Sequence, residues 1–136
     1  MTKSYMRMAV EELRAQETLE IAAKNKENQL DELALRLQIN GRINRTRLEK
    51  RQARLSSELA LLRSRIERCR RALDTLTDRQ RYLIEHLYVS DDSVLDIMEA
   101  LRIEKTAYYR LRRQAAAAFV RAMYGVELRD GPLERC

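Results

Sequence analysis

The stretch LEKRQARLSSELALLRSRIERCRRALDTL, residues 48–76, decides the fold of the first half of this chain. Its seam positions recur at alternating steps of four and three, and eight of the nine are apolar. They are Leu48, Gln52, Leu55, Leu59, Leu62, Ile66, Cys69, Leu73 and Leu76. This heptad pattern is typical of a helix that packs along one seam against another helix. The sequence therefore predicts a coiled-coil helix over these residues.

A second seam precedes the first and keeps the same alternation. Its positions are Leu19, Ala23, Lys26, Leu30, Leu33 and Leu37, with Lys26 as the polar exception. Asn40-Gly41 separates the two seams, and Asn-Gly is a strong turn signal. Two architectures follow: an antiparallel hairpin that closes at this turn, or one long helix that dimerises. We favour the hairpin, because glycine after the last periodic residue is a common helix stop.

Either architecture predicts a homodimer, because a two-helix hairpin alone buries little of its surface. We expect the seam of the second helix to drive self-association. The residues assigned to this contact are Leu48, Leu55, Leu59, Leu62, Ile66, Cys69 and Leu73. We interpret Cys69 as a small core hydrophobe rather than as a reactive thiol.

The composition excludes several classes of protein. The 136 residues include three glycines, one proline and no tryptophan, which favours an all-α fold. The longest apolar run, residues 115–120, is far shorter than the roughly 20 residues of a membrane span. The N-terminus also lacks the apolar segment of a signal peptide. We therefore expect a cytoplasmic protein that does not enter membranes.

The inventory of reactive residues argues against an enzyme. Cys69 and Cys136 are far apart, and His86 is the single histidine, which makes a zinc site improbable. The sequence contains no phosphate-binding loop, no dinucleotide-binding glycine motif and no nucleophile elbow. We expect neither catalysis nor a cofactor.

The net charge of +6 is unevenly divided along the chain. Residues 42–71 contain eleven basic and three acidic residues, a net charge of +8. Residues 72–101 carry a net charge of −5, and residues 102–121 carry +5. Basic residues gathered in short helical segments are typical of proteins that bind the phosphate backbone of DNA. Whether residues 42–71 also contact DNA stays open at this point.

The second half of the chain predicts a helix-turn-helix. Thr77-Asp78 can cap a new helix, and a polar break over residues 89–93 precedes an apolar helical face over residues 94–101. A three-residue turn, residues 102–104, then leads to a last helix that runs from about Lys105 to Tyr124. A short helix, a tight turn and a longer basic helix are the parts of a DNA-binding unit whose second helix enters the major groove.

The last helix has two different faces at 100° per residue. One face packs on the domain and contains Ala107, Tyr108, Leu111, Ala115, Ala118 and Ala122. The residues expected at DNA occupy the first turns of the other side: Lys105, Thr106, Tyr109, Arg110, Arg112 and Arg113. Arginines there suit guanine or phosphate, whereas Thr106 and Tyr109 suit phosphate or a thymine methyl group. Beyond the first turns, the side of the last helix that faces away from the domain becomes apolar too. We therefore expect this part of the helix to dock against the coiled coil or a second subunit.

The segment LTDRQRYLI (76–84), with SVLDIMEALRI (93–103), resembles the region-four helix-turn-helix of bacterial sigma factors. The continuation KTAYYRLRRQA (105–115) resembles the RinA/ArpU-type phage transcriptional regulators. This resemblance implies a sigma-like DNA-binding domain in an activator of phage or prophage late genes, with RNA polymerase as a possible partner. It also implies the same recognition residues that the helical wheel selects. Met98 and Arg102 depart from the family pattern, where a small residue and a glycine are usual.

The leading hypothesis is a sequence-specific transcriptional regulator that binds double-stranded DNA as a dimer. In this hypothesis residues 1–73 form the oligomerisation region, residues 74–125 the DNA-binding domain and residues 126–136 a tail. A small-terminase-like DNA-packaging protein is the first alternative, and it predicts a ring of more subunits. A coiled-coil interaction module is the second, and it predicts no salt-dependent affinity for duplex DNA.

Overall fold

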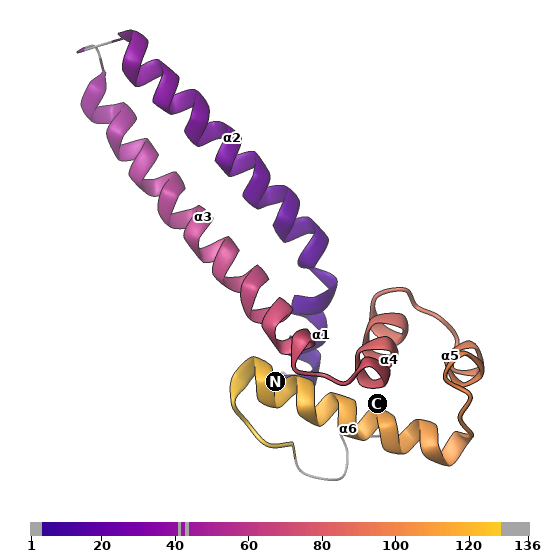
Figure 1. Cartoon of the computed structure of the whole chain (residues 1–136). Coiled ribbons are helices and arrows are strands. Elements are labelled where there is room, and N and C mark those ends of the chain that lie inside the picture. The colour runs from indigo at the N-terminus through magenta and orange to yellow at the C-terminus, as the bar shows by residue number, and fades with distance from the viewer. Residues whose placement is uncertain (1–3, 41, 43, 129–136) are drawn as a thin grey trace. The chain divides into compact units, whose positions relative to one another are not determined.

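The computed structural model describes residues 4–40, 42 and 44–128 of the chain. In these residues it contains helices and no strand, which confirms the expected all-α class (Figure 1). The helices are α1 (Tyr5–Arg14), α2 (Gln16–Asn40), α3 (Arg45–Asp74), α4 (Asp78–Tyr88), α5 (Val94–Leu101) and α6 (Lys105–Tyr124). Gly41 of the expected turn, Cys136 and residues 129–136 of the expected tail lie outside the described residues.

The chain divides into two compact units. The hairpin unit comprises residues 16–67, which include α2 and most of α3. The core unit comprises residues 1–15 and 68–136, so it combines α1 with the end of α3 and with α4, α5 and α6. This division differs from the expected boundary between residues 73 and 74. The difference arises because the apolar side of α1 is buried together with the C-terminal helices.

In the hairpin unit, α2 and α3 lie side by side and run in opposite directions (Figure 1). The two predicted seams supply its buried side chains: Leu19, Ala23 and Leu33 from α2, and Leu55, Leu59 and Ile66 from α3. Lys26, the polar exception in the first seam, forms an ion pair with Glu58, with 2.6 Å between Nζ and Oε2. Glu27 also pairs with Arg63 across the two helices. The ammonium of Lys26 and the guanidinium of Arg63 lower the pKa of Glu58 and Glu27 respectively by hydrogen bonding.

Most of the residues assigned to self-association are already packed against other residues of the same chain. Leu55, Leu59 and Ile66 are buried in the hairpin unit, whereas Cys69 and Leu73 are buried in the core unit. Leu48 and Leu62 are half-buried. Most of the seam therefore finds a packing partner inside one chain, whereas Leu48 and Leu62 stay partly exposed.

The core unit contains the largest fully buried side chains of the described residues. They are Tyr108, Phe119, Leu83, Ile84, Ile97, Val120 and Cys69. The apolar face of α1 joins this core with Met6, Ala9, Val10 and Leu13, at the helical spacing i, i+3, i+4 and i+7. Burial raises the pKa of the Cys69 thiol to about 11, so the thiol is protonated at neutral pH. This confirms Cys69 as a small core residue.

Polar caps fix where the helices of the core unit begin. The Thr77 hydroxyl accepts from the Gln80 backbone N–H, and the Gln80 side chain accepts from the Thr77 N–H, which completes a capping box at α4. The Ser93 hydroxyl caps α5 by accepting a hydrogen bond from the backbone N–H of Asp96. Gly125 ends α6 with a φ of +69°, a left-handed conformation that glycine adopts readily. The predicted extents of α5 and α6 are confirmed.

Candidate nucleic-acid interface

A tight turn connects α5 to α6. Arg102 adopts a left-handed conformation, with a φ of +56°. Its N–H donates to the carbonyl of Glu99 at 3.1 Å, and the N–H of Ile103 donates to the carbonyl of Met98 at 3.0 Å. This pair of bonds ends α5 and satisfies carbonyls that its last turn leaves unpaired. The guanidinium of Arg79 on α4 donates to a further carbonyl, that of Leu101, at 3.1 Å.

The two departures from the sigma-like pattern lie in this turn and in α5. Met98 is half-buried and packs against the core, as does Ile103, so the larger side chain is accommodated between the helices. Arg102 occupies a conformation in which an L-residue is strained and glycine is not. The departure at Arg102 therefore costs stability without preventing the turn.

The first turns of α6 present most of the predicted DNA-contacting residues together. Lys105, Thr106, Tyr109, Arg110 and Arg113 are all exposed. On the opposite side of the same helix, Tyr108, Ala115 and Phe119 are fully buried. The rings of Tyr109 and Tyr108 meet edge to face, with 5.1 Å between their centroids, which holds Tyr109 against the helix surface. The helix thus has an exposed basic face fixed by a packed face.

Arg112 differs from the other five predicted residues, because it is half-buried. Burial raises the pKa of the Tyr108 hydroxyl, and the neighbouring positive charge of Arg112 opposes that shift. The guanidinium of Arg112 therefore lies beside a core tyrosine. Its position gives it a structural role in addition to any contact with a ligand.

The apolar far side of α6 is covered by α1, an element that the sequence reasoning missed. Val120 is fully buried, and the rings of Tyr124 and Tyr5 lie 5.6 Å apart. The Arg68 guanidinium, in the part of α3 that belongs to the core unit, lies 5.8 Å from the centre of the Tyr124 ring. The missed signal was the helical spacing of the apolar residues in residues 6–13. The cover that we expected from a coiled coil or a second subunit thus comes in part from the chain's own N-terminus.

Two polar contacts connect other elements of the core unit: one joins α1 to the end of α4, and the other joins α4 to the loop before α5. Arg14 at the end of α1 donates through Nε to the carbonyl of Tyr88 at 2.8 Å. Nδ1 of His86, in the last turn of α4, lies 2.7 Å from a carboxylate oxygen of Asp92 in the loop before α5. The His86 ring also stacks on Tyr82, with 3.9 Å between centroids. These contacts make His86 a structural residue that connects α4 to the following loop.

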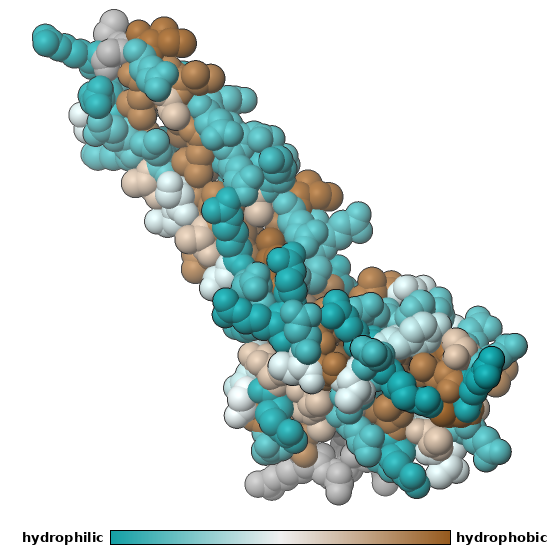
Figure 2. Space-filling view, in the orientation of Figure 1, coloured by the Kyte–Doolittle hydropathy of each residue, from teal (hydrophilic) through white to brown (hydrophobic). Residues whose placement is uncertain are grey.

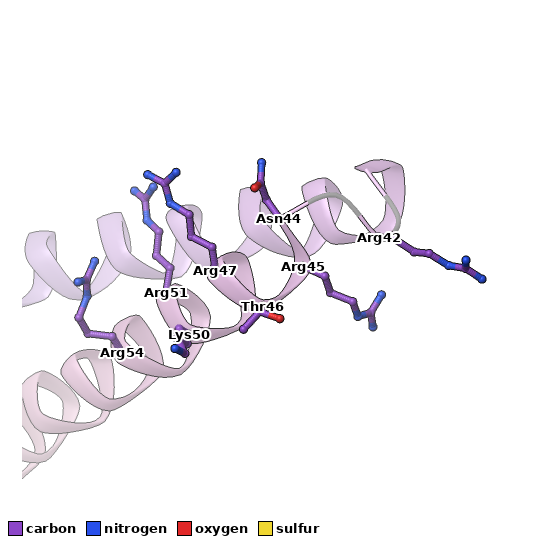
Figure 3. Close-up of a pocket in the computed structure, with 8 residues that line it drawn as sticks. All are labelled: Arg42, Asn44, Arg45, Thr46, Arg47, Lys50, Arg51 and Arg54. Carbon is purple, nitrogen blue, oxygen red and sulfur yellow. The ribbon is translucent and has the colours of Figure 1, made fainter.

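A second basic surface lies in the hairpin unit, near the start of α3. Cationic side chains dominate the hollow in Figure 3, whose lining residues are Arg42, Asn44, Arg45, Thr46, Arg47, Lys50, Arg51 and Arg54. The two basic surfaces belong to different units of the chain.

Comparisons with protein-family models, with curated proteins and with solved structures found no match to this chain. Within residues 4–128, apart from positions 41 and 43, no helix has the length and apolar character needed to cross a membrane. The same residues contain no cluster of three or more His, Cys, Asp or Glu side chains suited to a metal ion.

Proposed function

We propose that this protein is a sequence-specific transcriptional regulator that binds double-stranded DNA through the N-terminal half of α6. One observation carries the proposal: Lys105, Thr106, Tyr109, Arg110 and Arg113 are exposed on a helix whose opposite face is fully buried. A basic face of this size, presented after a short helix and a tight turn, fits the major groove. The resemblance of about residues 74–124 to sigma region four and to RinA/ArpU-type regulators supports the same role, with RNA polymerase as a second partner.

Selection of duplexes from a random pool at two salt concentrations tests this function. We expect one enriched sequence family, with an affinity that falls steeply as salt rises, because binding releases counterions from the phosphates. Salt-dependent binding without enrichment would contradict base reading. An absence of binding at low salt would contradict the whole proposal.

The proposal includes a homodimer, because helix-turn-helix proteins commonly bind two half-sites as dimers. We place its interface outside the heptad seam, because five of the seven residues assigned to self-association are buried within one chain. Ile21, Leu35 and Ile39 of α2, with Leu61 of α3, are each more than half exposed. Figure 2 shows hydrophobic residues (brown) along the hairpin between hydrophilic ones (teal). Sedimentation should give a dimer at micromolar concentration. A monomer would contradict this part, and a larger ring would favour DNA packaging.

A further inference from the structure

The densest cationic surface of the hairpin unit lies at the end where α2 finishes and α3 begins. Residues 42–54 contain six basic residues and one acidic residue. We name the tip cluster as Arg36 of α2 together with Arg42, Arg45, Arg47, Lys50, Arg51 and Arg54. Arg36 belongs to it because it lines one hollow together with Asn44, Arg47 and Arg51. Two helices therefore contribute cations to the same place.

The pairing of charges changes between the middle of the hairpin and its tip. In the middle, Lys26 pairs with Glu58 and Arg63 pairs with Glu27. At the tip, the carboxylate of Glu49 pairs with Arg45. Arg36, Arg47, Lys50 and Arg51 form no ion pair with any residue that the structure describes. Like charges one turn apart on a helix repel each other weakly, so this arrangement favours the binding of an external anion.

The side chains of the tip are arranged to meet such an anion. Figure 3 shows Arg47, Arg51 and Arg54 projecting from one side of α3, with Asn44, just before the helix, pointing the same way. Guanidinium groups bind phosphate oxygens through two parallel hydrogen bonds, and the side-chain amide of Asn44 can donate another. The described lining residues include no aromatic ring on which an unpaired base could stack. This chemistry favours the backbone of a double helix over a single strand.

We propose that the tip cluster binds the phosphate backbone of duplex DNA, as a second contact surface in a different unit from α6. Contacts to phosphates carry no sequence information, so this surface would strengthen binding to any duplex equally. This inference rests on one part of the proposed function, namely that the polyanion is duplex DNA. It does not depend on base reading by α6.

The test compares two full-length double variants. Arg47→Gln/Arg51→Gln removes two unpaired cations of the tip cluster. The matched control, Arg7→Gln/Lys24→Gln, removes two exposed cations that lie outside both the tip cluster and the first turns of α6. Fluorescence anisotropy measures the affinity of each for a labelled duplex of scrambled sequence, between about 50 and 200 mM salt. All four side chains are exposed, so circular dichroism should show unchanged helix content.

We expect the tip variant to bind the scrambled duplex at least about tenfold more weakly, with a salt slope reduced by about one for each lost phosphate contact. The control should keep the slope of the unaltered chain. Equal losses in both variants would overturn the proposal, because net charge alone would then explain them. Unchanged DNA binding with a lost affinity for polyglutamate would also overturn it and assign the tip to an acidic protein partner.

A second duplex separates this inference from the proposed function. The tip variant should keep the preference for a selected duplex over the scrambled one, whereas Arg113→Ala should lose it. If Arg113→Ala keeps the preference while the tip variant is weakened, base reading by Arg113 is contradicted and the tip proposal stands. If Arg113→Ala loses the preference and the tip variant binds normally, the tip proposal fails alone.

Discussion

The core unit and the hairpin unit are both helical, yet they are stabilised by different means. Among the described residues, the large side chains with less than 2% exposure all lie in the core unit. The most buried side chain of the hairpin unit, Leu33, remains 3% exposed, and the adjacent seam positions Leu30 and Leu37 are half-buried. Ion pairs between α2 and α3 flank that narrow seam. We therefore expect the core unit to supply most of the stability.

The difference also bears on how each unit presents its cations. In the core unit, α6 exposes its basic face because the opposite face is packed, so the direction of each side chain is fixed. In the hairpin unit, the cations gather at the end of the helix pair on a scaffold with a thin apolar seam. A fixed face suits base reading, which requires defined geometry, whereas phosphate contacts tolerate looser placement.

The largest expected effect is a cavity in the core unit. Phe119→Ala should lower the free energy of unfolding by about 3–5 kcal/mol, because it removes a fully buried ring. The corresponding change in the hairpin unit, Leu59→Ala, should cost less, near the lower end of about 2–5 kcal/mol, because its partly exposed surroundings can relax. Urea denaturation followed by circular dichroism measures both.

Leu95→Ala serves as the control for this pair, because Leu95 is 74% exposed and its loss creates no cavity. It should change the free energy of unfolding by less than about 0.5 kcal/mol. A loss for Leu59→Ala as large as that for Phe119→Ala would show that the two units contribute equally, which would break the comparison.

A smaller effect of opposite sign is expected in the turn between α5 and α6. Arg102→Gly should raise the free energy of unfolding by about 0.5–1 kcal/mol, because relief of the left-handed strain exceeds the entropy cost of glycine. Thermal unfolding measures the change. Ala100→Gly, in the right-handed part of α5, should instead lower stability by about 1 kcal/mol. A destabilising Arg102→Gly would mean that the Arg102 side chain has a stabilising role larger than the strain.

The smallest effect is a pH dependence confined to the hairpin unit. The pKa values of Glu27 and Glu58 are lowered below 4.5 by Arg63 and Lys26. The stabilisation that these two ion pairs give the hairpin unit is therefore present above pH 4.5. It is lost as the pH falls through the lowered pKa values, since the unfolded state then binds more protons. Hydrogen exchange should show weaker protection of α2 below pH 4.5, with α4 and α6 unchanged. Glu27→Gln/Glu58→Gln should abolish this dependence. Equal loss in both units would contradict the assignment.

The sequence predicts the helices well and their partners only in part. Thr77, Ser93 and Gly125 are recognisable caps, and the extents of α5 and α6 follow from them. The heptad pattern of residues 48–76 is equally regular throughout, yet Ile66 is buried in the hairpin unit and Cys69 in the core unit. A helical period shows which face is buried, but it does not identify the surface that buries it.

The candidate site shows the same limit. The helical wheel places Thr106, Tyr109 and Arg113 on the exposed face, with Lys105, Arg110 and Arg112 beside it, and the structure exposes all of these except Arg112. It does not distinguish Arg112, whose half-burial depends on its position beside Tyr108. Nor does it identify α1 as a cover for the end of α6, because that contact joins opposite ends of the sequence.

The most direct test of the account compares two arginines on the same helix. Arg113 lies on the exposed face of the first turns of α6, whereas Arg121 lies near its end and pairs with Glu127 at 2.9 Å. Binding of a selected duplex should weaken by about 1–3 kcal/mol in Arg113→Ala, with relaxed preference at one base position. Arg121→Ala should bind as the unaltered chain does. Equal affinities for the two variants would contradict the claim that the N-terminal half of α6 reads DNA.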